Sequence, residues 1–262
     1  MHPQKHVDRI RHICEIGGGV LDQGDTPVCA ESFEIALLSA GGVLVACDAV
    51  MTGQSPDGRA VKRAFSAGRP PGHHAEIDRP MGFCLFSNIA IGARYLQAKY
   101  NIQKVAIVDF DVHHGNGTQD VFDADPSVFF VSMHQHPRTC YPGSGYEWEI
   151  GTGAGRGFTM NVPFQAGAGD EEYLAALREK IIPAVDAFAP EVLMISAGFD
   201  GHADDPLASI ELSEEGFAQI TRELVLLAEK HCGGRIISVL EGGYNLRALG
   251  RSVVRHLVEL GR

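Results

Sequence analysis

Short runs of apolar and β-branched residues alternate along the chain with longer stretches in which apolar residues recur every three or four positions. The short runs predict strands at 61–66, 104–110, 128–133, 158–164, 192–197 and 235–240. The longer stretches predict helices at 7–15, 30–40, 86–99, 170–188 and 214–231. Strands that alternate with helices form parallel sheets covered on both faces. The chain is therefore predicted to be an α/β protein with a mostly parallel central sheet flanked by helices.

Two glycines interrupt the longest apolar stretch, residues 35–51. Gly41 and Gly42 are expected to stop or kink the helix that begins near residue 30. Ser39 and Asp48 add polar groups, so the stretch is expected to be a core helix that runs into a loop, and no membrane span is expected. The first residues lack the apolar segment of a signal peptide. Since no linker divides the chain, residues 1–262 are predicted to form one domain.

Polar side chains gather where predicted strands end. Strand 104–110 leads into Asp109-Phe-Asp111-Val-His113, in which strand-like alternation places both carboxylates and the imidazole on one face. The turn at 69–75 is stiffened by two prolines and carries adjacent histidines. The carboxyl ends of parallel strands meet at one edge of a sheet. At that edge we expect these residues to converge: His73, His74, Asp111, His113, Asp200 and Tyr244.

This set of side chains suits a catalytic metal ion. Two aspartates and a neutral histidine supply three protein ligands and leave room for water and substrate. Oxygen and nitrogen ligands suit Zn²⁺ and also Fe²⁺, Mn²⁺ or Co²⁺. A divalent ion lowers the pKa of its water and polarises a carbonyl oxygen, so hydrolysis of an amide or ester is the expected reaction. The two histidines would transfer protons, Asp109 would orient one of them, and Tyr244 would donate its hydroxyl to the developing oxyanion.

Composition narrows the choice of partners and compartment. Asp and Glu number 33 against 22 for Lys and Arg, and the net charge of -11 disfavours nucleic acid and anionic membranes and suits a cationic substrate. The 6 cysteines are scattered without a C-x-x-C pair. This spacing predicts neither a disulfide framework nor a thiolate zinc site, and it favours a reducing cytoplasm.

Seven motifs, in order and approximate spacing, resemble those of the histone deacetylase family. They are R-P-P-G-H-H-A at 69–75, G-F-C-L-F-S-N at 82–88, D-F-D-V-H-H-G-N-G-T-Q at 109–119, S-M-H at 132–134, N-V-P at 161–163, S-A-G-F-D at 196–200 and E-G-G-Y-N at 241–245. The chain is most similar to the class II branch and to bacterial histone-deacetylase-like amidohydrolases. The resemblance implies the arginase/deacetylase fold and zinc-dependent removal of acyl groups from lysine-like amines, including those of proteins and peptides.

The resemblance also implies a role for each residue of the centre. Asp111, His113 and Asp200 match the zinc ligands. The catalytic set comprises His73 as general base, His74 as general acid or electrostatic partner, Asp109 as the carboxylate that orients the first histidine, and Tyr244 as the tyrosine that stabilises the transition state. Asn116 follows the class II pattern, where class I members carry Asp. A neutral amide stabilises an imidazolium less than a carboxylate does, so we expect a lower pKa for His74 than in class I.

A tunnel for the acyl-lysine side chain is implied as well. Phe83 and Tyr141 match its aromatic walls, although the second is usually Phe; Gly82 would line it through its backbone, and Asp25 matches the rim aspartate that holds the substrate backbone. Leu207 stands where polyamine-selective members place an acidic residue, which favours acyl-lysine over acetylpolyamine. Structural K⁺ sites would use mainly carbonyl groups, those of Asp109, Asp111, His113, Ser132 and Met133 and those of Phe122, Asp125, Val128 and Phe158.

The N-terminal part departs from the family pattern. The segment between Arg11 and Asp25 is much shorter than in relatives, so the first strand and much of the loop beside the tunnel are expected to be absent. We therefore hypothesise a wider tunnel mouth, which would admit longer acyl groups or small acylated amines, or would be completed by a second subunit of a homo-oligomer.

Three other functions stay open. An arginase-type ureohydrolase would need a two-manganese cluster, to which only Asp204 and Asp205 superficially point, and would leave Tyr244 without a role. A deacetylase-like domain could bind acylated ligands without turnover. An acetylpolyamine amidohydrolase would perform the same chemistry on a different amine, and it is the main alternative to an acyl-lysine deacylase.

Overall fold

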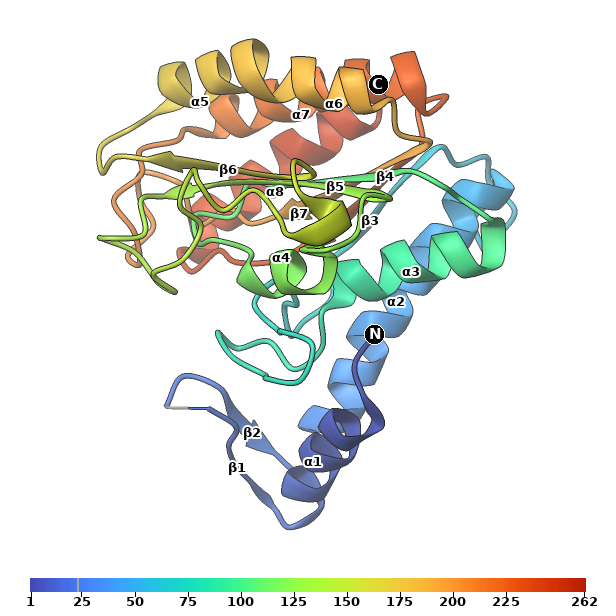
Figure 1. Ribbon diagram of the computed structural model, residues 1–262, viewed down its shortest axis with the longest axis vertical. Coiled ribbons are helices and arrows are strands. Elements are labelled where there is room, and N and C mark those ends of the chain that lie inside the picture. Colours follow the sequence, from blue (N-terminus) through green and yellow to red (C-terminus); the bar gives the residue numbers. More distant parts are fainter. Residues whose placement is uncertain (23) are drawn as a thin grey trace.

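The computed structural model describes residues 1–22 and 24–262, which form a three-layer α/β body and a smaller N-terminal extension (Figure 1). Within these residues the central layer is a sheet of six strands in the order β3-β8-β7-β4-β5-β6, and every neighbouring pair is parallel. The strands are β3 (Arg63–Ser66), β4 (Val105–Asp109), β5 (Val128–Gln135), β6 (Thr159–Phe164), β7 (Val192–Ala197) and β8 (Ile236–Leu240).

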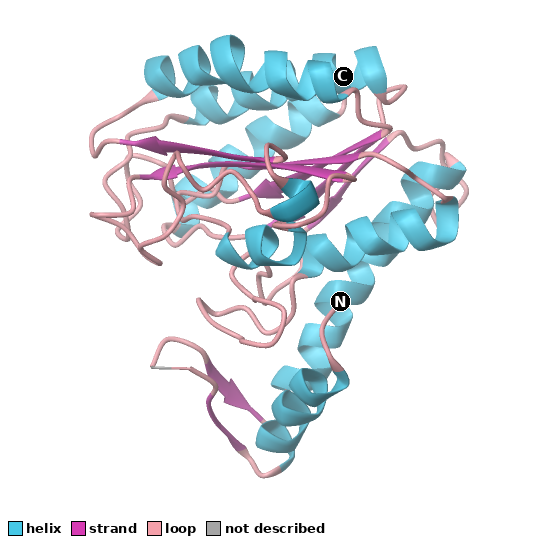
Figure 2. Ribbon diagram, in the orientation of Figure 1, coloured by secondary structure: helices cyan, strands magenta, loops and turns pink. Residues whose placement is uncertain are grey.

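Helices cover both faces of this sheet (Figures 1 and 2). One face is covered by α2 (Ser32–Thr52), α3 (Asn88–Tyr100) and α4 (Asn116–Phe122). The other is covered by α5 (Asp170–Ala176), α6 (Ile182–Phe188), α7 (Glu214–His231) and α8 (Leu246–Leu260). A π-helical turn, η2 (Leu177–Ile181), joins α5 to α6, and a single 3₁₀ turn, η1 (Gly153–Gly155), precedes β6.

Alternate residues of the inner strands enter two separate cores. In β4, Val105 and Ile107 pack with α2 and α3, whereas Ala106 and Val108 pack with the helices of the opposite face. Successive strand side chains point to opposite faces, and both faces here are covered, so both sets must be apolar. This two-sided burial explains the uninterrupted apolar runs from which the parallel sheet was predicted, and the α/β prediction is confirmed.

The prediction that Gly41 and Gly42 would stop the helix near residue 40 is wrong. Helix α2 continues to Thr52 because burial of its inner side chains, including Val43 and Cys47, outweighs a glycine cost of about 1 kcal/mol each. A Cβ atom at Gly42 would lie 3.2 Å from Ser66 Oγ. The missing side chain therefore lets α2 approach β3 closely.

The N-terminal extension holds a hairpin that the sequence did not reveal. Strands β1 (Gly18–Val20) and β2 (Pro27–Cys29) pair antiparallel and lie beside α1 (Gln4–Glu15) and the first half of α2 (Figure 1). Gly18 has φ 106°, and a Cβ atom there would lie 2.2 Å from the Val28 carbonyl oxygen. The backbone conformation and close approach at Gly18 thus allow the two strands to pair. Neither an apolar alternation nor a recognised turn motif in the sequence predicts this pair.

Helix α2 is, in the described ranges, the single helix that is long and apolar enough to cross a membrane by those two criteria. Its inner side packs against α3 and the sheet. The same length and composition occur in core helices of proteins that cross no membrane, and this packing is that of a core helix.

His256 of α8 gives the core a pH-dependent contribution to stability. Its Nδ1–H donates to Thr221 Oγ1 at 2.7 Å, and the Ser238 hydroxyl donates to its Nε2 at 2.9 Å. Burial lowers the pKa of His256 to about 3. This folded-state pKa is depressed below the unfolded value of about 6.5. The folded state therefore loses stability as pH falls below about 6.5, by at most about 1.4 kcal/mol per pH unit.

We expect the midpoint of thermal unfolding to fall between pH 7 and pH 5, and to fall less steeply in His256→Gln, whose side chain does not titrate. Calorimetric scans of both proteins at three pH values measure the two slopes. If the unfolding midpoint falls equally steeply with pH in both proteins, His256 is not the cause of the pH dependence.

Candidate metal centre and tunnel

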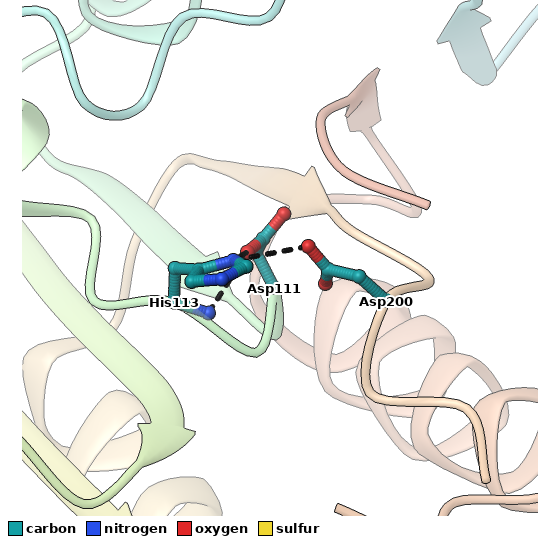
Figure 3. A group of neighbouring side chains, drawn as sticks. All are labelled: Asp111, His113 and Asp200. Carbon is teal, nitrogen blue, oxygen red and sulfur yellow. Dashed lines mark hydrogen bonds and ion pairs between the residues drawn. The ribbon is translucent and has the colours of Figure 1, made fainter. Parts of the chain in front are cut away.

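Three buried ligand groups converge at the carboxyl edge of the sheet (Figure 3). Asp111 and His113 follow β4, and Asp200 follows β7, its neighbour in the sheet. His113 Nδ1 lies 3.1 Å from Asp111 Oδ1 and 3.1 Å from Asp200 Oδ2. Ligand atoms around a tetrahedral zinc ion are separated by roughly 3.3–3.6 Å, given bonds of about 2.0–2.2 Å. The two distances to His113 are slightly shorter than this, as expected for hydrogen-bonding contacts, and all three ligand atoms lie within 4.8 Å of one another, close enough to share one divalent ion.

Backbone groups fix the direction of both carboxylates. Asp111 Oδ2 accepts the N–H of Gly242 at 2.8 Å, and Asp200 Oδ1 accepts the N–H of Val112 at 3.0 Å. A Cβ atom at Gly198 would lie 2.0 Å from Asp111 Oδ2, and one at Gly242 would lie 2.1 Å from Asp200 Oδ2. Only glycine fits at these two positions beside the carboxylates.

The electrostatics of the triad favour a bound cation. Burial, together with the negative charge of Asp111, raises the pKa of Asp200 to about 6. Burial disfavours the charged imidazole of His113, but the carboxylates of Asp200 and Asp111 outweigh it and raise its pKa well above the usual value. Two carboxylates in one buried site thus compete for positive charge, which a divalent ion would supply.

His73 and His74 lie beside the triad, and each is held through its Nδ1 atom. His73 Nδ1–H donates to Asp109 Oδ2 at 2.9 Å, and His74 Nδ1–H donates to Asn116 Oδ1 at 2.7 Å. Asp109 and Asn116 each present an acceptor oxygen, so the Nδ1 atoms of both histidines carry protons. The two Nε2 atoms are then available for proton transfer to and from water or substrate. Asn116 in turn donates to Glu76 Oε1 at 2.8 Å, which fixes the orientation of its amide.

The pKa values of the two histidines move in opposite directions. Burial opposes the charged form of His73, but the carboxylates of Asp111 and Asp109 outweigh it and raise its pKa to about 10. Burial and the neighbouring imidazoles of His73 and His113 lower the pKa of His74 well below its usual value. The hydrogen bond to Asn116 itself raises the pKa of His74, so the lowering comes from burial and the neighbouring imidazoles, and the comparison with class I stays a prediction. Groups whose pKa values are pushed apart are suited to separate acid and base roles.

A cavity of 220 Å³ opens beside the triad. It is lined by Asp25, His74, Gly82, Phe83, His113, Tyr141, Leu207 and Tyr244. We call this cavity the tunnel. All five positions that the resemblance assigns to substrate binding line it, and their individual roles stay predictions. His73, Asp109 and Asn116 are buried next to the cavity without lining it.

Close packing shapes the tunnel wall. A Cβ atom at Gly82, where φ is 57°, would lie 2.4 Å from His74 Cδ2, so the bare backbone lies directly against the imidazole. The Tyr141 ring meets His74 edge-on at 5.1 Å between centroids, and Phe83 meets Tyr244 at 6.1 Å. Asp25 Oδ1 accepts the Gly82 N–H at 3.2 Å, which ties the rim carboxylate to this wall.

Tyr244 is positioned by Asp205. Asp205 Oδ2 accepts the N–H groups of Tyr244 at 2.7 Å and Asn245 at 3.1 Å, and the neighbouring Asp204 carboxylate pairs with Arg251. These two aspartates are therefore engaged away from the triad, which removes the one feature that pointed to a two-metal ureohydrolase. Burial and the carboxylates of Asp200 and Asp111 raise the pKa of Tyr244, so its hydroxyl stays protonated at neutral pH.

Sequence reasoning assigned no role to Glu241. This buried carboxylate accepts the N–H groups of Gly72 at 2.7 Å and His73 at 3.1 Å, and the Ser196 hydroxyl at 3.1 Å. Burial raises its pKa to about 7. Glu241 thus joins the histidine turn to the ends of β7 and β8. An acidic residue directly after a buried strand was the available signal, as it is for Asp111 after the predicted strand 104–110.

The positions assigned to potassium lie in ordinary sheet and turn structure. Asp109 and Ser132 are register partners of β4 and β5, and the Phe158 carbonyl accepts the N–H of Phe130 at 2.9 Å. The Asp125 carboxylate is engaged by Arg94 and Ser127. Potassium binding stays a prediction.

Comparison with known proteins agrees with this site. The histone deacetylase domain family matches residues 1–260. A histone deacetylase-like amidohydrolase of Pseudomonas aeruginosa is 41% identical over 94% of this chain, and a probable deacetylase of Archaeoglobus fulgidus is 44% identical over 94%. The chain spans 62% and 66% of the lengths of these two relatives.

A solved structure extends the comparison to the fold. The crystal structure of the HDA15 HD domain superposes with a TM-score of 0.92 at 38% identity, over 99% of this chain and 72% of that one. A family match over nearly all residues, a shared fold and the Asp-His-Asp triad all lead to one assignment. The chain belongs to the histone deacetylase family.

Proposed function

We propose that this protein is a zinc-dependent deacylase that hydrolyses the amide of acyl-lysine, with an acetyl or a longer acyl group. The observation that carries the proposal is the buried triad of Asp111, His113 and Asp200 beside a cavity of 220 Å³ that aromatic side chains line. The names of the relatives, which include an amidohydrolase and a probable deacetylase, support it.

The triad would hold the ion, and the surrounding residues would move protons. A divalent ion there supplies Lewis acidity, which lowers the pKa of water and polarises the substrate carbonyl, and its charge offsets the carboxylates that raise the pKa of His73. Asp109 holds His73 with Nε2 available as the general base. His74 lines the tunnel with Nε2 available to return a proton to the leaving amine.

Tyr244 completes the proposed mechanism. Tyr244 lines the tunnel, and its hydroxyl is protonated. This hydroxyl would donate a hydrogen bond to the substrate oxygen that gains negative charge when water attacks. Phe83 and Tyr141 would hold the apolar stem of the acylated side chain between their rings.

The remaining expectations are kept as proposals. Leu207, half exposed at the rim, offers no carboxylate to a second ammonium group, which favours acyl-lysine over acetylpolyamine. Fe²⁺ would suit the same ligands. Cytoplasmic location, homo-oligomer formation and structural K⁺ are proposed on the grounds given above.

The test is a peptide with a fluorogenic acetyl-lysine amide, assayed with zinc-loaded protein before and after treatment with a chelator. We expect turnover that the chelator abolishes and that added Zn²⁺ restores, with Fe²⁺ as a second metal to compare. Binding of the peptide without turnover would instead support the non-catalytic alternative. Turnover that survives complete metal removal would contradict the proposal.

A further inference from the structure

A second cavity of 310 Å³ adjoins the tunnel, and Phe83 lines both. We call this second cavity the side groove. Its walls are mainly apolar and come from four segments: β2 (Pro27, Val28), α2 (Ile35), the turn before the catalytic histidines (Pro70, Pro71) and the segment that carries Phe83 and Leu85. The side groove and the tunnel therefore meet at Phe83.

Arg69 is the charged residue that lines the side groove. In the part of the chain that the structure describes, its guanidinium makes no hydrogen bond or ion pair with protein. Other arginines, such as Arg59, Arg63 and Arg79, pair with carboxylates. In a protein of net charge -11, an arginine without a carboxylate partner is available to an anionic ligand.

The position of Arg69 places this charge near the reacting groups. It lies four residues before His73 on the same turn, and its positive charge acts on the Tyr244 phenol, where it opposes the rise in pKa. The carboxylate of Asp25 lies in the wall of the tunnel, which Phe83 also lines. The two cavities thus offer one acidic and one basic group around a shared aromatic ring.

We propose, on the basis of the function proposed above, that the side groove binds the carboxylate of a free acylated diamino acid, of which Nε-acetyl-lysine is the simplest. Its acylated amine would enter the tunnel while its carboxylate meets Arg69. An internal lysine of a protein and an acylated polyamine both lack this carboxylate. Hydrolysis of the amide consumes one water molecule and yields the free diamino acid and the carboxylic acid.

Three substrates of equal reach test the proposal: Nε-acetyl-lysine, its carboxamide, and N-acetylcadaverine, which is the same chain without the carboxyl group. An Arg–carboxylate hydrogen bond is charge-assisted, so we expect zinc-loaded wild-type protein to prefer Nε-acetyl-lysine by about 10- to 100-fold in kcat/KM, mainly through KM. Arg69→Gln should lose this preference, so that its kcat/KM values for the three substrates become similar. Arg69→Lys should keep part of the preference, and Arg59→Gln should behave as wild type.

Calorimetric binding of Nε-acetyl-lysine and its carboxamide gives a readout that does not depend on turnover. If wild-type protein hydrolyses neither these three substrates nor the fluorogenic peptide but binds Nε-acetyl-lysine through Arg69, the proposed function fails and the side groove stands. Turnover of the peptide but of none of the three substrates overturns the inference. Equal kcat/KM for the three substrates in active wild-type protein overturns the inference. A preference that survives in Arg69→Gln overturns it as well.

Discussion

Replacing Asp200 with alanine is expected to abolish binding of a divalent ion and to lower amide hydrolysis by about 10³-fold or more. Asp200 supplies one of two carboxylates in a three-ligand site, and His113 Nδ1 lies equally close to both. Without it, the remaining carboxylate and imidazole can pair with each other and no longer compete for an ion. The water pKa then stays near its bulk value, so little hydroxide is available at neutral pH.

Asp204→Ala is the matched control for this prediction. Asp204 lies on the same loop but is largely exposed and pairs with Arg251. Metal content by mass spectrometry and kcat/KM should match wild type in this control and fall together in Asp200→Ala. Circular dichroism checks that both variants fold. Full metal content in Asp200→Ala would show that the ion is held elsewhere.

Tyr244→Phe is expected to lower kcat by about 10²- to 10³-fold, the usual effect of removing one donor to an oxyanion. The change removes only the hydroxyl and keeps the ring that packs against Phe83 at 6.1 Å. Asp205 holds this residue through its backbone N–H, so the loop should keep its conformation. Substrate binding and metal content should therefore change little.

Steady-state kinetics separate this effect into kcat and KM. Tyr146→Phe serves as the control because Tyr146 stacks on the exposed Trp148 in the loop after β5 and does not line the tunnel. If kcat in Tyr244→Phe equals that of wild type, the oxyanion is stabilised by another group and the role given to Tyr244 is wrong.

The parts of the fold that the sequence predicted are those that depend on simple periodicity. The apolar runs of β4 and β7 are buried on both faces, and polar residues follow them because only strand ends reach the sheet edge. Parallel pairing of β4 with β7 then brings Asp111 and Asp200 together although they are far apart in the chain. Apolar strands followed by polar residues in the sequence were therefore enough to predict that the site lies at the carboxyl edge of the sheet.

The parts that the sequence did not predict depend on contacts between distant segments. The continuation of α2 through Gly42 depends on the burial of Val43 and Cys47 in the core, which local propensity cannot reveal. The role of Glu241 depends on N–H groups of the turn that carries His73, a segment far away in sequence. The side groove depends on how the β1–β2 hairpin and α2 lie beside Arg69.

The glycines beside the ligand carboxylates limit how this protein can be redesigned. Libraries that aim to change acyl-chain selectivity should leave positions 198 and 242 unvaried, since any added side-chain carbon would displace a ligand oxygen. Diversity belongs instead at Phe83 and Leu207, whose side chains border the tunnel without contacting the triad carboxylates by hydrogen bonds. A screen designed this way would sample new substrates while retaining the machinery for cleavage.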